Sequence, residues 1–269
     1  MDYRERPAPP GLGLGCVWSQ TVPRAGLPYV QRVVPDACVD LIWSDWDGRI
    51  EVAGPDTGPV MARIPPGGRL TGVRFRPGLA GPALGVPVDA VRDGRVPLHE
   101  LWGADARALA DAVAGGADPA EALPGAVAAR QRGATPGARA DHADPAAPAL
   151  LAAIARPAAA CDPALPSAAS VRAIAGRLGL SERQLRRRSL AAFGYGPKTL
   201  QRILRFQRAL SLARRGISPS DVAYATGYTD QAHLAHEVRD LAGVPLTALL
   251  GPAAARPGPD AAAGAGPRR

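Results

Sequence analysis

A run of long polar side chains between residues 183 and 190 offers the most definite chemistry in this sequence. If Leu185 faces inward on a helix, the outward arc carries Arg183, Gln184, Arg186, Arg187 and Leu190. Arginine donates two parallel hydrogen bonds to guanine, and glutamine pairs similarly with adenine, each pair giving about 1–3 kcal/mol of discrimination. We therefore predict that the polar members contact base edges of double-stranded DNA. The cations expected to contact phosphates instead are Arg188, Lys198, Arg202 and Arg205.

A second set of polar side chains, about 48 residues further on, is less basic. With Leu234 inward, the predicted DNA contacts of this set are Gln231, His233, His236 and Arg239. Asp240 lies on the same arc, and a carboxylate costs affinity near phosphate unless it accepts from a cytosine amino group. We expect the first set to dominate specificity and the second mainly to position the protein on the duplex.

The elements that must position the first set have clear start and stop signals. An apolar stripe at helical spacing, formed by Val171, Ile174, Ala175 and Leu178, ends at Gly179. A second helix follows almost at once, because Ser181 and Gln184 have the spacing of a capping box. A small residue where two helices cross and a glycine in the turn are typical of a helix-turn-helix unit.

The same arrangement recurs, with Ala223 and Gly227 in place of Ala175 and Gly179. Ser218, Pro219 and Asp221 predict the start of its first helix, and the second begins around Asp230. Between the units, residues 197–216 predict one long amphipathic helix. Two units joined by a helix form a far more specific pattern than one.

Residues 165–250 resemble the DNA-binding domain of AraC/XylS-type transcriptional regulators, especially in FGYGPKTLQRILRFQRAL and GYTDQAHLAHEVRDLAGVPL. The first half, in PDACVDLIW, VAGPDTGPV and GVRFRPG, resembles a poorly characterised domain that precedes this module in many GC-rich bacteria. The resemblance implies a transcription regulator that binds promoter or operator DNA, with RNA polymerase and a second copy of the chain as further partners. It also implies that Ser189 replaces a large apolar residue, so we expect a partly filled core there and a higher melting temperature for Ser189→Phe.

The pattern of residues in the first half of the sequence predicts a small antiparallel sheet or barrel. Runs rich in Val, Ile and Trp (YVQRVV, CVDLIW, RIEV and RLTGVRF) alternate with WDG and GPDTG, which suit hairpin turns. Short helical pieces follow in RPGLAGPALG, in VPLHELWG and over residues 104–114. The expected fold class is α+β, with an N-terminal antiparallel β domain carrying short helices and a C-terminal all-α double helix-turn-helix domain.

Composition shifts divide the chain into four predicted segments. Residues 1–130 form a regulatory domain that binds an unknown small-molecule effector; residues 131–160, rich in Pro, Gly, Asp and Ala, form a linker; residues 161–252 bind DNA; residues 253–269 form a disordered tail. The aromatic candidates to line an effector pocket, or simply to fill a core, are Trp18, Trp43, Trp46 and Phe75.

Charge and cysteine content exclude several function classes. Of the formal net charge of +8, all the excess lies in residues 165–250, which hold 13 basic and 5 acidic side chains. Cys16, Cys38 and Cys161 are scattered, so we expect no disulfide framework, no metal site and no cofactor, and a reducing compartment. No secretory signal or run of about 18 apolar residues is present, which predicts a cytoplasmic protein without a membrane span.

The sequence is compatible with two alternatives. One is a protein-binding regulator whose helix-turn-helix units have lost DNA contacts, as Asp240 and His236 suggest. The other is a DNA-alkylation repair or response protein that uses a reactive cysteine such as Cys38. We expect no enzyme, because no catalytic motif or cysteine cluster is present.

Overall fold

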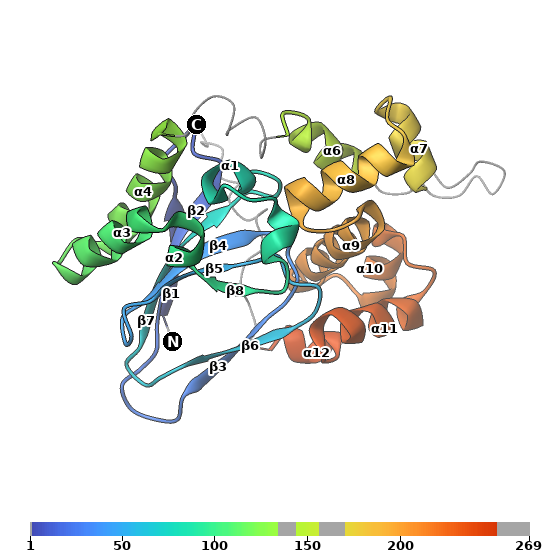
Figure 1. The fold of residues 1–269 in the computed structure, drawn as a ribbon. Helices are drawn as coiled ribbons and strands as arrows, with labels where there is room; N and C mark the ends of the chain where they lie inside the picture. Colours follow the sequence, from blue (N-terminus) through green and yellow to red (C-terminus); the bar gives the residue numbers. More distant parts are fainter. Residues whose placement is uncertain (1, 134–143, 156–169, 252–269) are drawn as a thin grey trace, which may run out of the picture.

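The computed structural model describes residues 2–133, 144–155 and 170–251, which form a β-rich region and a helical region side by side (Figure 1). The predicted tail, residues 134–143 and 156–160 of the predicted linker, and Cys161 lie outside the described residues.

The β-rich region contains a six-stranded sheet and a separate two-stranded ribbon, and every strand pair in them is antiparallel. The ribbon pairs β3 (Tyr29–Val33) with β6 (Val60–Ile64). The six-stranded sheet has the order β1 (Asp2–Pro7), β2 (Leu14–Thr21), β7 (Arg69–Phe75), β4 (Val39–Ser44), β5 (Ile50–Ala53) and β8 (Arg95–Pro97).

Alternation along the strands gives the six-stranded sheet two different faces. Leu41, Val73 and Phe75 point into one apolar core, which the helices after β7 cover. Asp40, one residue before Leu41, and Arg74, between Val73 and Phe75, form a buried ion pair on the opposite face. The covering elements are α1 (Gly81–Leu84), the 3-10 helix η1 (Val88–Val91), α2 (Leu98–Trp102), α3 (Ala104–Ala114) and α4 (Pro119–Gly133).

The helical region has a second core, which is continuous across both helix-turn-helix units. Its helices are α6 (Ala147–Ala155), α7 (Val171–Arg177), α8 (Glu182–Phe193), α9 (Pro197–Arg214), α10 (Pro219–Thr226), α11 (Gln231–Ala242) and α12 (Leu246–Leu249). We call α7 with α8 the first unit and α10 with α11 the second unit. The long helix α9 packs on both units, so they share one rigid frame.

The predicted fold class is confirmed, and two local expectations are wrong. GPDTG does not close a hairpin: it joins β5 of the six-stranded sheet to β6 of the ribbon. The segment predicted as a linker contains α6, whose Leu150 and Ile154 are fully buried in the helical core. Its composition concealed this helix because alanine and proline dominate around those two large side chains. No helix in the described ranges has the length and apolar character needed to cross a bilayer.

Candidate nucleic-acid interface

Each helix-turn-helix unit has the local geometry expected from its sequence. The turn residues Gly179 and Gly227 have φ angles of 64° and 75°, a region that favours glycine. Ala175 and Ala223 are buried where the helices of each unit cross. Both recognition helices, α8 and α11, begin with a side-chain cap.

The caps fix where the two recognition helices start. The Ser181 side chain accepts from the Gln184 amide (3.2 Å), and Gln184 Oε1 accepts from the Ser181 amide (2.9 Å), which is a complete capping box. Asp230 accepts from the His233 amide at 2.7 Å at the start of α11. These bonds satisfy amide groups that have no partner inside the helix.

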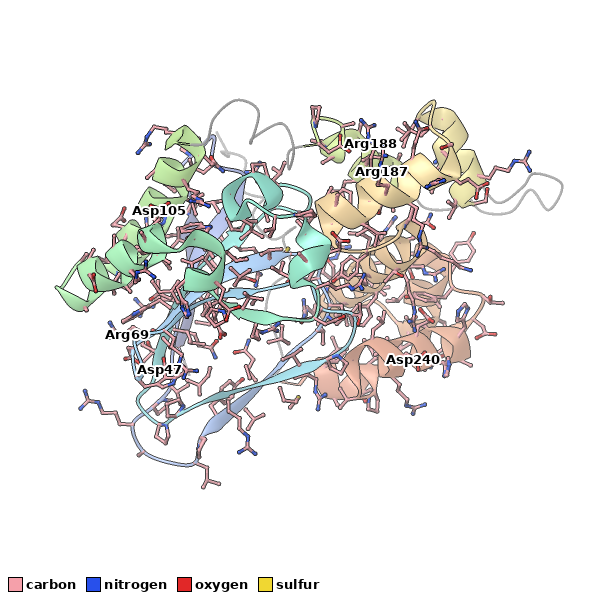
Figure 2. All side chains as sticks on the ribbon, viewed as in Figure 1. Asp47, Arg69, Asp105, Arg187, Arg188 and Asp240 are labelled. Carbon is pink, nitrogen blue, oxygen red and sulfur yellow. The ribbon has the colours of Figure 1, made fainter. Side chains whose placement is uncertain are left out.

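The outward face of α8 is exposed and basic. Arg183, Arg186 and Arg187 are exposed, and none has an ion-pair partner within the described residues. Figure 2 shows Arg187 and Arg188 on α8. Gln184 is exposed too, but its carbonyl oxygen serves the capping box, so its amide NH₂ is the group left to meet a base.

The structure divides the cations that were predicted to contact phosphates. Lys198 is exposed at the start of α9, with no partner among the described residues. Arg188 pairs with Asp144 at 3.3 Å. Arg205 lies over the ring of Tyr228, 4.5 Å from its centroid, and burial raises the pKa of that tyrosine to about 12. These two arginines therefore have structural roles inside the helical region.

Arg202 connects α9 to the second recognition helix. It pairs with Glu237 at 2.8 Å and with Asp240 at 2.9 Å, and its hydrogen bond to Glu237 is the main cause of its raised pKa. Asp240, which sequence reasoning treated as a group facing DNA, thus neutralises an arginine of the same chain. The acidic residues of α11 carried no sequence signal for this role, because the partner lies 35 positions away from Glu237.

The second recognition helix is the less basic of the two. Gln231 accepts from Ser220 at 3.1 Å, and His233 packs edge-on against Tyr228 with ring centroids 5.3 Å apart. His236 is exposed and lies 3.7 Å from Asp240, and Arg239 is exposed. All four predicted contacts lie on α11, but Arg239 is the one among them that carries a full positive charge at neutral pH.

Ser189 is hydrogen-bonded inside the core of the helical region. Its side chain is fully buried and donates a hydrogen bond to the carbonyl oxygen of Tyr195 (2.7 Å). The hydroxyl therefore satisfies a buried carbonyl, a role that the sequence did not reveal.

The β-rich region gathers its polar groups on the face opposite the helices. Asp40 accepts from Trp18 Nε1 at 2.7 Å and pairs with Arg74 at 3.2 Å. Trp18 therefore lies on a different face from Phe75 and Trp43, while Trp46 is 42% exposed. The four aromatic candidates do not line a common pocket.

Cys38 is buried beside this ion pair. Burial is the main cause that raises its pKa well above the usual value for a thiol, and the negative charge of Asp36 adds to the shift. Since the thiolate is the reactive form, this environment disfavours the reactive-cysteine alternative.

Two units with capped recognition helices, turn glycines and an exposed arginine face define the chain as a DNA-binding transcription regulator of the helix-turn-helix class. Comparison with known families agrees: residues 174–251 match the model described as a helix-turn-helix domain, and residues 14–97 match a domain of unknown function, DUF6597. The chain thus carries an AraC-type helix-turn-helix domain at its C-terminus and a DUF6597 domain before it, which confirms the resemblance seen in the sequence.

Solved structures of ToxT from Vibrio cholerae are similar over most of the chain. ToxT from strain O395 has 11% identity and a TM-score of 0.46, covering 87% of this chain and 96% of that one. Wild-type ToxT from strain SCE256, bound to an unsaturated fatty acid, has 10% identity and a TM-score of 0.41, covering 87% and 94%. No curated protein sequence matches this chain.

Proposed function

We propose that this chain binds a specific double-stranded operator and regulates transcription in response to a small molecule bound by its N-terminal domain. The observation that carries the proposal is the exposed arginine face of α8, set on a capped helix within a double helix-turn-helix domain. Arginine on the outward face of a recognition helix is the commonest means of reading guanine in the major groove.

The two units have different tasks in this proposal. α8 contacts base edges through Arg183, Gln184, Arg186 and Arg187. α11 positions the protein through Arg239 and its histidines, since Arg202 neutralises the acidic residues of that helix. Because α9 joins the units rigidly, one chain contacts adjacent major-groove segments about 34 Å apart on an asymmetric site.

We assign the regulatory role to residues 1–130 and DNA binding to residues 161–252. The effector shifts the population between two arrangements of these domains by binding one of them more tightly. RNA polymerase and a second copy of the chain are further partners in this scheme.

The test is binding of the whole chain to DNA from around its own gene and to a scrambled duplex of the same length, across a salt series. Specific binding whose logarithm falls linearly with the logarithm of salt concentration supports the proposal. Equal affinity for both duplexes at every salt concentration, with and without cell-derived small molecules, would overturn it in favour of a protein-binding regulator.

A further inference from the structure

The segment from residue 54 to residue 60, GPDTGPV, lies between the two regions of the molecule, and we call it the docking loop. It connects β5 of the six-stranded sheet to β6 of the ribbon. The six-stranded sheet and the ribbon therefore meet at this loop, next to the helical region.

The docking loop is rigidly held by the β-rich region. Asp56 forms a two-point ion pair with Arg95 at 2.9 and 2.8 Å. Asp93, whose φ of 57° is unusual for a residue other than glycine, accepts from the Thr57 amide at 2.6 Å. A Cβ on Gly54 would lie 1.7 Å from the carbonyl oxygen of Val91, so this position has room for no side chain.

Two prolines of the docking loop contact the ends of the two recognition helices. Gly194 ends α8 and Gly243 ends α11, both with left-handed backbone. A Cβ on Gly194 would lie 2.5 Å from Cγ of Pro55, and a Cβ on Gly243 would lie 3.2 Å from Cγ of Pro59. The two glycines occupy equivalent positions in the internal repeat. The C-terminal end of each recognition helix therefore contacts the docking loop.

Two arginines of the β-rich region reinforce these contacts. Arg92 Nη1 donates to the carbonyl oxygen of Gly194 at 3.1 Å, and Arg32 Nη1 donates to that of Ala242 at 3.0 Å. The last carbonyls of a helix have no partner within it and carry the negative end of its dipole, so a cation there stabilises the helix. Each recognition helix thus ends on one proline and one arginine of the N-terminal domain.

A further hydrogen bond joins the docking loop to the core of the first unit. Tyr195 donates its hydroxyl hydrogen to the carbonyl oxygen of Asp56 at 2.6 Å, and its own carbonyl accepts from Ser189 of α8.

The segments PDACVDLIW and GVRFRPG contact the helical region as well. Gln207 donates to the carbonyl of Pro35 at 2.5 Å, and a Cβ on Gly78 would lie 2.6 Å from Phe193. All three segments that carry the N-terminal resemblance therefore lie at this junction.

We propose that the docking loop, with Arg92 and Arg32, holds both recognition helices by their C-terminal ends and is the route by which the N-terminal domain regulates DNA binding. This inference rests on the proposed function. The contact to α8 comes from the side of the six-stranded sheet and the contact to α11 from the side of the ribbon. A change in the angle between sheet and ribbon therefore moves the ends of the two recognition helices relative to one another.

The docked arrangement supports DNA binding rather than masking it. The contacts lie at the C-terminal ends of α8 and α11. The predicted base contacts of α8 begin at its other end, with Arg183, and Arg239 in the last turn of α11 is exposed although that end is docked. Loss of docking loosens the helix ends and exposes no additional DNA-contacting residue.

The test uses the whole chain with Arg92→Ala and Arg32→Ala, and Arg63→Ala as the matched control. Arg63 lies exposed on the ribbon strand β6, and its side chain has no hydrogen-bond or ion-pair partner in the described ranges. Amide hydrogen exchange without DNA should accelerate over residues 190–195 in Arg92→Ala and over residues 239–244 in Arg32→Ala, and stay unchanged in Arg63→Ala. Affinity for a duplex selected by the wild-type chain from a random pool should fall about two- to fivefold in each docking variant.

A second pair of variants separates docking from backbone strain. Gly194→Ala and Gly216→Ala both place alanine at a positive φ, 76° and 80°, but a Cβ on Gly216 meets no atom within 4 Å. Faster exchange in the docking loop with Gly194→Ala alone supports the proposal. Unchanged exchange at both helix ends in the arginine variants, or changed exchange with unchanged DNA affinity, would overturn it. A wild-type chain that selects no duplex would instead refute the proposed function, while the exchange data would still report on docking.

Discussion

Lys198 and Arg202 lie one helical turn apart on α9, yet the structure gives them different roles. Lys198 is exposed and has no partner in the part of the chain that the structure describes, whereas Arg202 is neutralised by Glu237 and Asp240. We predict that Lys198→Ala reduces the slope of log affinity for DNA against log salt concentration by about 1 and leaves the melting temperature unchanged.

Arg202→Ala should instead lower the free energy of unfolding, by less than about 1 kcal/mol because the side chain is partly exposed. A reduced slope from Arg202→Ala with unchanged stability would contradict this assignment.

Ser189 is a polar residue that the core requires. Removal of its hydroxyl leaves the buried carbonyl of Tyr195 without that hydrogen bond, so Ser189→Ala should cost about 1–3 kcal/mol in denaturant unfolding. Ser189→Phe should destabilise the chain as well, instead of raising its melting temperature, because the ring cannot donate the hydrogen bond to the buried carbonyl of Tyr195. A melting temperature raised by the phenylalanine would show that the hydroxyl is dispensable.

At the scale of elements, the two recognition helices differ in charge and should differ in their share of specificity. Arg187→Ala removes a free cation from α8 and should cost about 1–3 kcal/mol of specific binding. His236→Ala should cost less, since His236 is paired with Asp240 on a helix that is already partly neutralised. Quantitative binding to one selected duplex measures both, with Arg172→Ala on α7 as an exposed arginine control. Equal losses from Arg187→Ala and His236→Ala would refute the ranking.

Helix α6 belongs structurally to the DNA-binding region although it precedes the predicted boundary at residue 161. It buries Ala147, Leu150 and Ile154 against the core that contains α8 and α9. We therefore predict that a fragment of residues 144–251 melts at a clearly higher temperature than a fragment of residues 160–251, because loss of a single buried leucine costs about 2–5 kcal/mol. Equal melting temperatures would place α6 outside the cooperative unit.

Local signals predicted the helical elements well and the β-rich elements only in part. Ser181, Pro197 and Ser218 mark helix starts through bonds between near neighbours, so their effect is visible in the sequence. β1 was missed because its residues, DYRERP, are exposed and lack apolar alternation. The sequence did not reveal the intramolecular contacts of Arg202 and Arg205, because Glu237 lies on another helix and Tyr228 in the turn before it.

At the scale of the whole molecule, the β-rich region holds the two recognition helices at their C-terminal ends. Exposed polar side chains begin at the N-terminal ends of α8 and α11, and the β-rich region contacts Gly194 and Gly243 at the other ends. The predicted contacts of α8 lie toward its N-terminal end, and Arg239, in the last turn of α11, is exposed in the docked arrangement, so the N-terminal domain can act on DNA binding without covering these predicted contacts.

The central claim is that the whole chain reads a specific duplex, mainly through α8. Its most direct test is the affinity of the wild-type and Arg187→Ala chains for a duplex selected by the wild type and for a scrambled duplex, at several salt concentrations. We predict that the wild type prefers the selected duplex by at least about a thousandfold, with a salt slope that reports several phosphate contacts, and that Arg187→Ala loses much of this preference. Equal affinity of the wild type for both duplexes, or a preference that Arg187→Ala leaves intact, would contradict the claim.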